Sequence, residues 1–587
     1  MNFFKDKTLD PVTWIQINSD NFNEDKYEQT GLLWDYYWNR YFQVKFQILR
    51  TKKKVIKYST NNGINLRVDT QKDLLYPLNN LEQIKYLKWL EIQNPNLNQS
   101  ERWILIWKGQ ALADIGGEYS NGSKQGPWKE PIENYWTLSQ VYYIGNYLDG
   151  ERIGIWKYIY EDQLIGGGIY DNKNIKNGKW IELSENFSNN ANITYSGEYK
   201  NNKKVDKWEI KYRFSCVYQL ECIGGGSYNQ EGIKNGLWID LIDNFYRYNS
   251  NFNQFQYLSL RQVTFNGEYQ NGKKVGRWDT YFRIESLFQS QFQLIGGGSY
   301  DETGIKNGNW IEPSNNFYKY SQVTYEGEYQ NGKKINQWVT RYKQKDQLDF
   351  ICGGEYDAVG SIKKGFWVEL SDEFRQDNQI VYQGIYHNGK KIGRWDINFR
   401  ELDQFEKIGV CYYDEQFNKI GFQKEISESF FNLSQVIYIG EYQDGQKTGQ
   451  WKIYWKNNLK IEELGSGLYG ENGLKKGNWI ELAIDFNEDK QVTYYGEYHY
   501  GQKVGLWVTY FRFSVNFEEI GCGCYDDEGI QNGFWIELDE DFSGSKQIIY
   551  KGQYKNGKKF EKWQEFKRDK WKIDQGFQKI GETYYQN

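Results

Sequence analysis

The sequence predicts an all-β repeat protein, an elongated antiparallel sheet of tandem β-hairpins with a short mixed or helical N-terminal region. Two observations predict this fold. A thirteen-residue pattern, GEYQNGKKVGRWD at residues 267–279, returns along most of the chain, and the spacings inside the repeats stay constant. Composition agrees, because Gly is frequent, Pro is rare and aromatic residues make up 18% of the 587 residues. Such a composition is typical of many strands joined by tight turns.

The repeats fall into two unit types. The first runs from the Gly of a G-x-Y triplet to the Trp of a G-x-W triplet, with an offset of 11 residues in eight copies, as from Gly267 to Trp278. The second has an offset of 14 in six copies, as from Gly296 to Trp310, and in a degenerate copy that ends at Gln423. A hairpin keeps a constant offset because a one-residue slip would move every side chain to the opposite face.

The segments between the units vary from 10 to 29 residues. Surface loops accept such insertions at little thermodynamic cost. We therefore expect the tight turns to share one edge of the sheet and the variable loops to share the other.

The turn residues agree with hairpins. The first unit turns through Asn-Gly, as at Asn271-Gly272, or Asp-Gly, dipeptides that readily take positive φ. The residue two before each Trp is Gly, Asn or Asp in seven of eight copies and Glu561 in the last, which predicts a bulge there. The predicted structural repeat positions are Gly267, Tyr269, Asn271, Gly272, Gly276, Trp278, Gly327, Tyr329, Trp338, Trp395, Trp451, Trp507 and Trp563.

Alternation along the strands places apolar residues on both faces of the sheet. In the recurring Trp-Ile-Glu-Leu, for example, Trp and Glu share one face while Ile and Leu share the other. Two explanations remain open. Aromatic side chains could pack on glycine-rich backbone, or the sheet could be covered in part by its own loops.

The segment YEGEYQNGKK at residues 325–334 resembles the core of a MORN repeat, Y-x-G-x-(W/Y)-x-N-G, and the resemblance covers roughly residues 100–587. The chain continues with G-x-W where the usual form has G-x-G, like the second MORN variant of bacterial proteins and large protist repeat families. The resemblance implies a single-layer sheet of stacked hairpins used for protein or membrane association. It also implies a location at cytoskeletal or cortical structures.

The repeat array is predicted over residues 96–587, as about eight double units of about 56 residues, after an N-terminal region of unknown fold at residues 1–95. A capping helix is expected near residues 79–93, where apolar residues recur at helical spacing: Leu81, Ile84, Leu87 and Leu90. The chain stops within a unit at residues 580–587. This half unit would either cap the sheet or pair with another chain as an edge-strand homodimer.

No catalytic, cofactor or metal site is expected. The two histidines, His387 and His499, occupy the same turn-entry position, which is unlike a catalytic base. Cys522-x-Cys524 lacks a second ligand pair at zinc spacing. The recurring Glu residues fit cross-strand partners of Lys, because an enzyme needs one asymmetric site. The sequence therefore favours a protein that is not an enzyme.

Charge and cysteine content narrow the partners and the location. A net charge of -5 gives no global basic field, so nucleic acid is not expected as a partner. Six scattered cysteines do not form a disulfide framework. The start of the chain has no signal-peptide pattern, and no segment has the length of a membrane helix. We expect a cytoplasmic protein.

Charged turns give a candidate interaction edge. Lysine pairs at first-unit turns alternate with acidic second-unit turns about 10 Å away, near one Debye length, so the two signs would largely cancel at a membrane. We expect this edge to face other proteins, with weak membrane association at most. Its residues are Lys203, Lys204, Lys273, Lys274, Lys333, Lys334, Lys390, Lys391, Lys558, Lys559, Asp301, Glu302, Asp526 and Asp527.

The sequence thus predicts a non-enzymatic scaffold or adaptor that binds other proteins. Two alternatives stay open. One is a peripheral membrane tether that binds anionic lipids through the lysine turns, and the other is an enzyme or regulatory domain within residues 1–95.

Overall fold

The computed structural model consists of two compact units, residues 1–305 and 306–587, and is nearly all β. The division between the units falls inside the predicted repeat array. The structure describes residues 25–35, 40–50, 55–60, 65–70, 81–93, 100–189, 191–213, 220–243, 245–252, 255–285, 290–344, 347–372, 374–401, 404–457, 460–483, 485–513, 516–539, 542–571 and 573–585.

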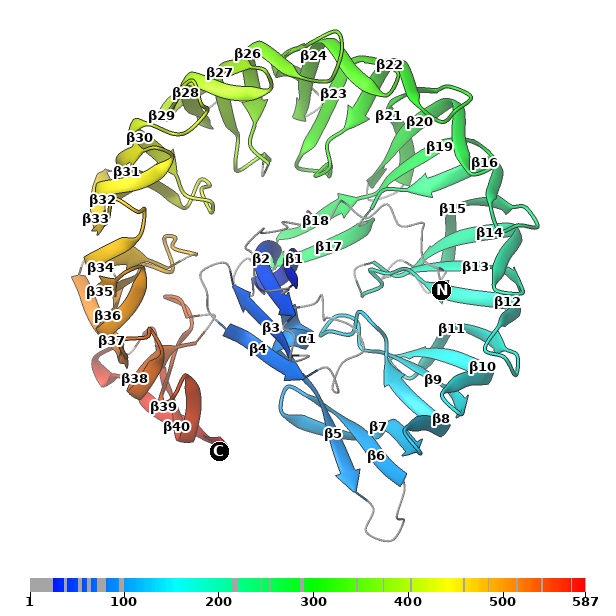
Figure 1. Ribbon diagram of the computed structural model, residues 1–587, viewed down its shortest axis with the longest axis horizontal. Coiled ribbons are helices and arrows are strands. Elements are labelled where there is room, and N and C mark those ends of the chain that lie inside the picture. The colour runs from blue at the N-terminus through cyan, green and yellow to red at the C-terminus, as the bar shows by residue number, and fades with distance from the viewer. Residues whose placement is uncertain are drawn as a thin grey trace. The chain divides into compact units, whose positions relative to one another are not determined.

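The first unit contains a small antiparallel sheet, one short helix, a two-stranded arm and a row of antiparallel strands (Figure 1). The small sheet comprises β1 (Asp25–Asp35), β2 (Arg40–Arg50), β3 (Val55–Thr60) and β4 (Asn65–Thr70), the helix is α1 (Leu81–Tyr86), and the arm is β17 (Tyr246–Phe252) with β18 (Phe255–Arg261). The row comprises β5 (Leu87–Gln93), β6 (Ser100–Trp107), β7 (Gln110–Ser120), β8 (Ser123–Pro131), β9 (Val141–Leu148), β10 (Glu151–Tyr160), β11 (Gln163–Tyr170), β12 (Lys176–Leu183), β13 (Ile193–Lys200), β14 (Lys203–Arg213), β15 (Leu220–Tyr228), β16 (Lys234–Leu241), β19 (Val263–Gln270), β20 (Lys273–Glu285) and β21 (Ser290–Tyr300).

The second unit is a row of strands in chain order, each antiparallel to the next (Figure 1). The strands are β22 (Lys306–Pro313), β23 (Gln322–Gln330), β24 (Lys333–Gln344), β25 (Gln347–Tyr356), β26 (Lys363–Leu370), β27 (Ile380–His387), β28 (Lys390–Glu401), β29 (Gln404–Tyr413), β30 (Gly421–Ile426), β31 (Gln435–Gln443), β32 (Gln446–Lys456), β33 (Ile461–Tyr469), β34 (Lys475–Leu482), β35 (Val492–His499), β36 (Gln502–Phe513), β37 (Asn516–Tyr525), β38 (Gln531–Leu538), β39 (Gln547–Lys555), β40 (Lys558–Arg568) and β41 (Gln578–Tyr585). A 3₁₀ turn, η1 (Ile573–Gln575), precedes β41.

The predicted hairpins and turns are confirmed. Between β19 and β20, Gln270 pairs with Lys273 across Asn271 and Gly272, whose φ angles are 49° and 80°. These are the angles of a two-residue type I′ turn, which matches the twist of the flanking strands. The bulge two residues before the Trp is present in all eight first units, including the last, where Glu561 has a φ of 53°.

The helix predicted near residues 79–93 is shorter than expected. It ends at Tyr86, and the following residues form β5, which pairs with β6 from Leu87 opposite Trp107 to Gln93 opposite Glu101. Helical spacing is a weak preference that tertiary context overrides. Here the backbone ladder to β6 takes up the polar groups that a longer helix would have paired internally.

One second-type unit differs from its predicted alignment. The pairing of β24 with β25 places Cys352, and not Gly353, at the opening position, opposite Thr340. The turn that follows is one residue longer than in other copies. The amide of Asp357 donates to the carbonyl of Ile362, five residues on, whereas the equivalent amide of Asp301 donates to that of Ile305, four residues on. The predicted offset of 14 residues, from Gly353 to Trp367, is therefore wrong for this copy. The unit opens at Cys352, one residue earlier, and the extra residue lies in the turn.

The apolar core lies on one face of the sheet. We call the face that carries Trp278 and its equivalents the ladder face, and the opposite face the open face. Near the turns, aromatic rings of the ladder face lie on glycine backbone. Near the loops, a buried aromatic residue from the loop covers this face, a Phe in most units and Tyr135 between β8 and β9. Phe245, for example, packs with Ile193, Ile210 and Tyr212. Both explanations left open by the sequence therefore apply to this face.

Candidate interaction surfaces

The predicted repeat positions build a ladder of Trp and Tyr rings. Trp278 is buried, and a β-carbon built on Gly267 would overlap its indole ring. The ring meets Tyr269 edge-on at 5.2 Å between centroids, and its Nε1 donates to the carbonyl of Glu268 at 3.2 Å. The same Gly–Trp contact recurs at Trp338, Trp395, Trp451, Trp507 and Trp563. Glycine is required at these positions because the ring lies directly on the backbone.

An acidic residue two positions after the Trp of a second-type unit, or after Gln423 in the degenerate copy, binds a tyrosine and two cations, except that Glu537 pairs with Lys559 alone because Gln531 replaces the other lysine. The Glu481 carboxylate contacts Lys475, accepts a hydrogen bond from the Tyr498 hydroxyl at 2.9 Å and pairs with Lys503 at 3.1 Å. Burial alone would raise the pKa of Glu481, but the two lysine charges outweigh it and hold this pKa below its usual value. Equivalent carboxylates are Glu130, Glu182, Asp240, Glu312, Glu369, Glu425 and Glu537.

The second lysine of each predicted turn pair belongs to this network. Lys334 lies 3.8 Å from the Trp338 ring centroid and 3.5 Å from the Glu312 carboxylate. Burial lowers its pKa, and Glu312 offsets only part of that effect. The equivalent lysines Lys204, Lys274, Lys391 and Lys559 also lie over a Trp and pair with a carboxylate. The fold uses these five cations, although they were predicted as part of an interaction edge.

The first lysine of each pair lies at the surface. Lys203, Lys273, Lys333, Lys390 and Lys558 are exposed. Lys333 donates to the carbonyl of Val359 at 3.1 Å and Lys390 lies 4.8 Å from the Phe417 ring centroid, but within the described residues none of the five pairs with a buried carboxylate as the second lysines do.

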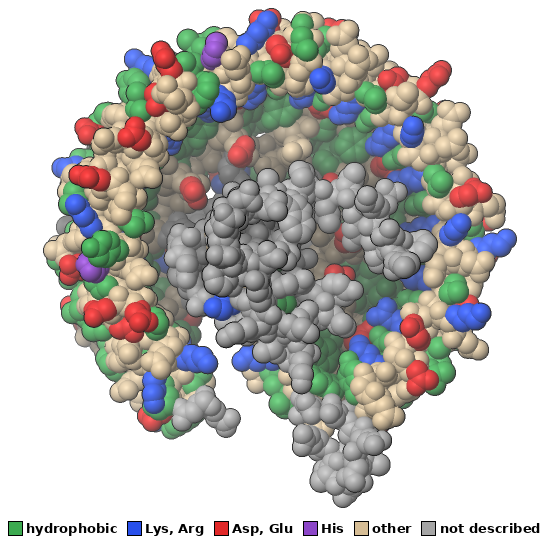
Figure 2. Space-filling model, viewed as in Figure 1, with side chains coloured by type: hydrophobic (Ala, Val, Ile, Leu, Met, Phe, Trp, Pro, Cys, Tyr) green, Lys and Arg blue, Asp and Glu red, His purple; other side chains and the backbone are tan. Residues whose placement is uncertain are grey.

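The acidic turns show a similar division. Asp301 accepts hydrogen bonds from the amides of Thr303 and Ile305 at 2.9 and 3.0 Å, and Asp526 holds its own turn in the same way. Glu302 and Asp527 are exposed. One charge of each predicted turn pair therefore supports the fold, and the other faces solvent. Figure 2 shows acidic and basic side chains interspersed on the visible face.

The open face carries large exposed apolar side chains that the sequence analysis did not select as a site. Phe366 is 63% exposed and its cross-strand partner Ile385 is 52% exposed. Other exposed side chains beside ladder tryptophans are Ile155, Leu237, Phe422, Leu506 and Phe534. The signal was present in the sequence, since these residues directly precede the Trp, or Gln423 in the degenerate copy, and so alternate onto the opposite face. Exposed apolar clusters of this kind mark interaction sites.

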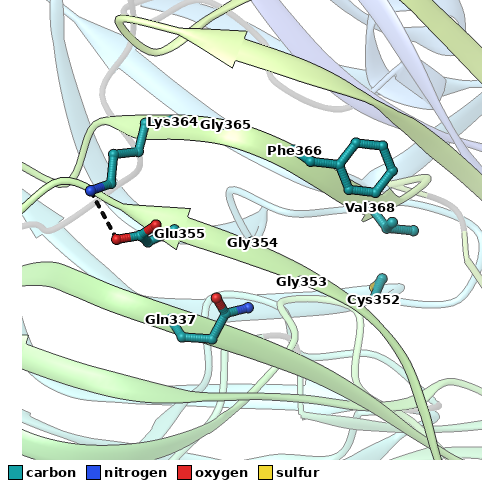
Figure 3. A pocket seen from close by; sticks show the side chains of 9 residues that line it. All are labelled: Gln337, Cys352, Gly353, Gly354, Glu355, Lys364, Gly365, Phe366 and Val368. Atoms are coloured by element: carbon teal, nitrogen blue, oxygen red, sulfur yellow. Dashed lines mark ion pairs between the residues drawn. The ribbon is translucent and has the colours of Figure 1, made fainter.

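A hollow in the open face lies beside Phe366 (Figure 3). Its floor is the backbone of Gly353 and Gly354 on β25, and its walls come from β24 and β26. Glu355 and Lys364 form an ion pair of 2.8 Å at one end, and both side chains are about half exposed. The full lining is Gln337, Cys352, Gly353, Gly354, Glu355, Lys364, Gly365, Phe366 and Val368.

Within the described ranges, no group of three or more His, Cys, Asp or Glu side chains is arranged to hold a metal ion. Among the helices that the structure describes, none is long and apolar enough to cross a membrane.

No family model matches the chain, and no curated protein matches it. Similar solved structures include a protein from Lactobacillus plantarum, 9% identical, with a TM-score of 0.16 over 67% of this chain and 96% of the other. They also include a mutant form of the NanB sialidase from Streptococcus pneumoniae, 11% identical, with a TM-score of 0.16 over 91% of this chain and 86% of the other. At such scores these similarities carry no argument about function.

Proposed function

We propose that this chain is a non-enzymatic repeat scaffold, related to MORN repeat proteins, that binds other proteins through the open face of its sheet. The observation that carries the proposal is the cluster of Phe366 and Ile385, exposed side by side on neighbouring strands. Contiguous exposed apolar patches are typical of protein interaction sites, and these two side chains lie directly opposite each other on β26 and β27. A position at cytoskeletal or cortical structures is part of the same proposal and rests on the resemblance alone.

The chemistry of the ladder face supports a structural role for the repeated charges. Each recurring carboxylate is engaged by lysine and by a tyrosine hydroxyl, as at Glu369, Lys391 and Tyr386. A general acid or base needs an accessible carboxyl whose pKa is tuned towards the working pH, whereas the pKa of Glu369 is held low by its lysines against the effect of burial. These groups therefore favour a scaffold over an enzyme. Much of residues 1–95, where an enzymatic domain was an alternative, lies outside the described residues.

The test is affinity capture from an extract of the source cells with the full chain as bait. A Phe366→Ser/Ile385→Ser variant should lose specific, saturable partners, because its open-face cluster is gone. The matched control, Ile155→Ser/Leu237→Ser, removes exposed apolar residues elsewhere on the open face and should retain them. Both sets of residues are well exposed, so neither variant should unfold. Identical captured proteins with both variants and the unaltered chain would refute a binding role for this cluster.

The membrane tether is a weaker proposal. Lipid binding needs a cluster of free cations, and five of the ten predicted edge lysines pair with carboxylates instead. Flotation with anionic vesicles at physiological salt tests it. Strong flotation that disappears when Lys333, Lys390 and Lys558 are replaced by Ser would favour the tether.

A further inference from the structure

We propose that the hollow beside Phe366 binds a tyrosine side chain presented by a partner polypeptide. This inference rests on the scaffold function proposed above and names the chemistry of the contact. Three features of the hollow carry it: a bare backbone floor, a division into an apolar and a polar end, and a working example of the same contact on the ladder face.

The floor has the surface that an aromatic ring needs. Gly353 and Gly354 place no side chain on β25, and Gly353 has a φ of 149°, where a β-carbon would overlap the carbonyl of Trp338. On the ladder face, the Trp367 ring lies directly on Gly354. The chain therefore already packs an aromatic ring on this glycine backbone from one side. The opposite side offers the same flat strip between the walls of the hollow (Figure 3).

The two ends of the hollow differ in polarity along the strands. Gln337 on β24, Glu355 on β25 and Lys364 on β26 are register partners and form one polar row. Towards the other end lie Phe366 and Val368 (Figure 3). A tyrosine has a matching division, since its ring is apolar and its hydroxyl lies at the far end. With the ring beside Phe366, the hydroxyl would reach the polar row, where the Glu355 carboxylate can accept its proton in a hydrogen bond.

The ladder face of β26 and the two strands after it holds a tyrosine in this way. The Tyr386 hydroxyl donates to the Glu369 carboxylate at 3.0 Å, and Lys363 and Lys391 pair with that carboxylate. The recurring contact of this protein is thus a tyrosine hydroxyl bound to a carboxylate that pairs with lysine, beside an aromatic ring. In the hollow, Glu355, Lys364 and Phe366 supply every part of it except the tyrosine.

A phenylalanine or leucine would fit the hollow less well. Either would cover the polar row without giving the half-exposed Glu355–Lys364 pair a hydrogen bond, and covering a polar group without a partner is costly. Discrimination by a missing hydroxyl is strong where the site is built to bind one. Partial exposure of the pair reduces the penalty here, so we expect a moderate preference for tyrosine.

The test uses the full chain and the probe N-acetyl-3-fluoro-L-tyrosinamide, followed by ¹⁹F NMR line broadening. Affinity of about 1 mM is expected for a ligand of this size. Phe366→Ser should reduce the broadening at least about threefold, by removing one wall of the hollow. The matched control is Phe534→Ser, which deletes a similarly exposed Phe, 54% exposed, from the equivalent position of another unit and should leave the broadening unchanged.

A second probe, N-acetyl-4-fluoro-L-phenylalaninamide, isolates the hydroxyl. It should bind at least about threefold more weakly than the tyrosine probe, and Glu355→Gln should narrow that difference. Equal broadening in Phe366→Ser and the unaltered chain, or equal affinity for both probes, would overturn the inference. Loss of captured partners in Phe366→Ser/Ile385→Ser without any tyrosine-probe binding would leave the scaffold proposal standing and refute only the tyrosine assignment.

Discussion

Each ladder Trp requires a facing glycine, and one unit of the chain, which has a different pair of residues at these two positions, shows how to test this requirement. Second-type units pack their Trp on a glycine, but the unit of β29 and β30 has Cys411 and Gln423 at the two positions. Gln423 is fully buried and its amide donates to the carbonyls of Tyr412 and Ile420 at 3.1 and 2.7 Å. The pair Gly467 and Trp479 is the regular counterpart.

Three variants follow from this comparison. Gly467→Cys places a β-carbon inside the Trp479 ring, so the ring must leave the backbone, at a cost of about 3 kcal/mol. Trp479→Gln removes a ring that is 3% exposed, again at about 3 kcal/mol. In the double variant the clash is absent and Gln can bond as Gln423 does. We expect a total near 4 kcal/mol rather than the sum of about 6, a coupling of about 2 kcal/mol.

Hydrogen exchange is the suitable assay, because a long repeat array does not unfold in one step and a global midpoint would average over it. The opening free energy of amides within residues 461–482 reports the local effect. Gly477→Ala is the matched control: its φ is 66°, a β-carbon there meets nothing, and the strain costs about 1 kcal/mol. A cost for Gly467→Cys no larger than this control, or strictly additive single variants, would refute the reasoning.

Three further predictions use the same networks. Glu561→Gly should stabilise β40 by about 1 kcal/mol by relieving a left-handed non-glycine residue, while Glu561→Ala should give no gain; hydrogen exchange at the last hairpin measures both. Lys559→Met should cost about 1–2 kcal/mol, since Lys559 lies 4.1 Å from the Trp563 ring and 2.8 Å from Glu537. The neighbouring exposed Lys558→Met should change stability by less than about 0.5 kcal/mol, and equal effects on hydrogen exchange of the β39–β40 hairpin would contradict the assignment. The folded pKa of Glu481 is held below its ordinary value of 4.5, so the stability contributed by its ion pairs is present above that value and is lost as pH falls through the folded pKa. Glu481→Gln should therefore lower the local free energy of opening at pH 7 and make it depend less on pH in acid. An acid pH dependence identical to that of the unaltered chain would count against this.

The sequence was sufficient for the hairpins because their determinants are local. Asn271-Gly272 takes a turn that only positive-φ residues accept easily. Gly, Asn or Asp two residues before the Trp predicted the bulge in seven units, and the structure has it also at Glu561, the exception to that pattern. The strand at Leu87–Gln93 could not be predicted in this way, since its pairing with β6 competes with a helical pattern of similar strength.

The candidate site was harder to predict because it depends on which way neighbouring side chains turn. Two adjacent lysines look equivalent in sequence, yet Lys334 folds over Trp338 while Lys333 stays exposed. Consecutive residues of a strand point to opposite faces, so only Lys334 reaches the ladder face, where it pairs with Glu312 of the preceding hairpin. The hollow likewise depends on the register at Cys352, which counting residues did not reveal.

The shared carboxylates also constrain how such a chain can lengthen or shorten over generations. Glu481 lies on the closing strand of one hairpin, and its second lysine, Lys503, comes from the next. Duplicating or deleting a single hairpin would leave such a carboxylate with only one of its two counter-ions, Lys475 in the case of Glu481. Gain or loss of two hairpins together keeps every pair intact, and the 56-residue steps from Trp451 to Trp507 to Trp563 have the length of such an inherited block.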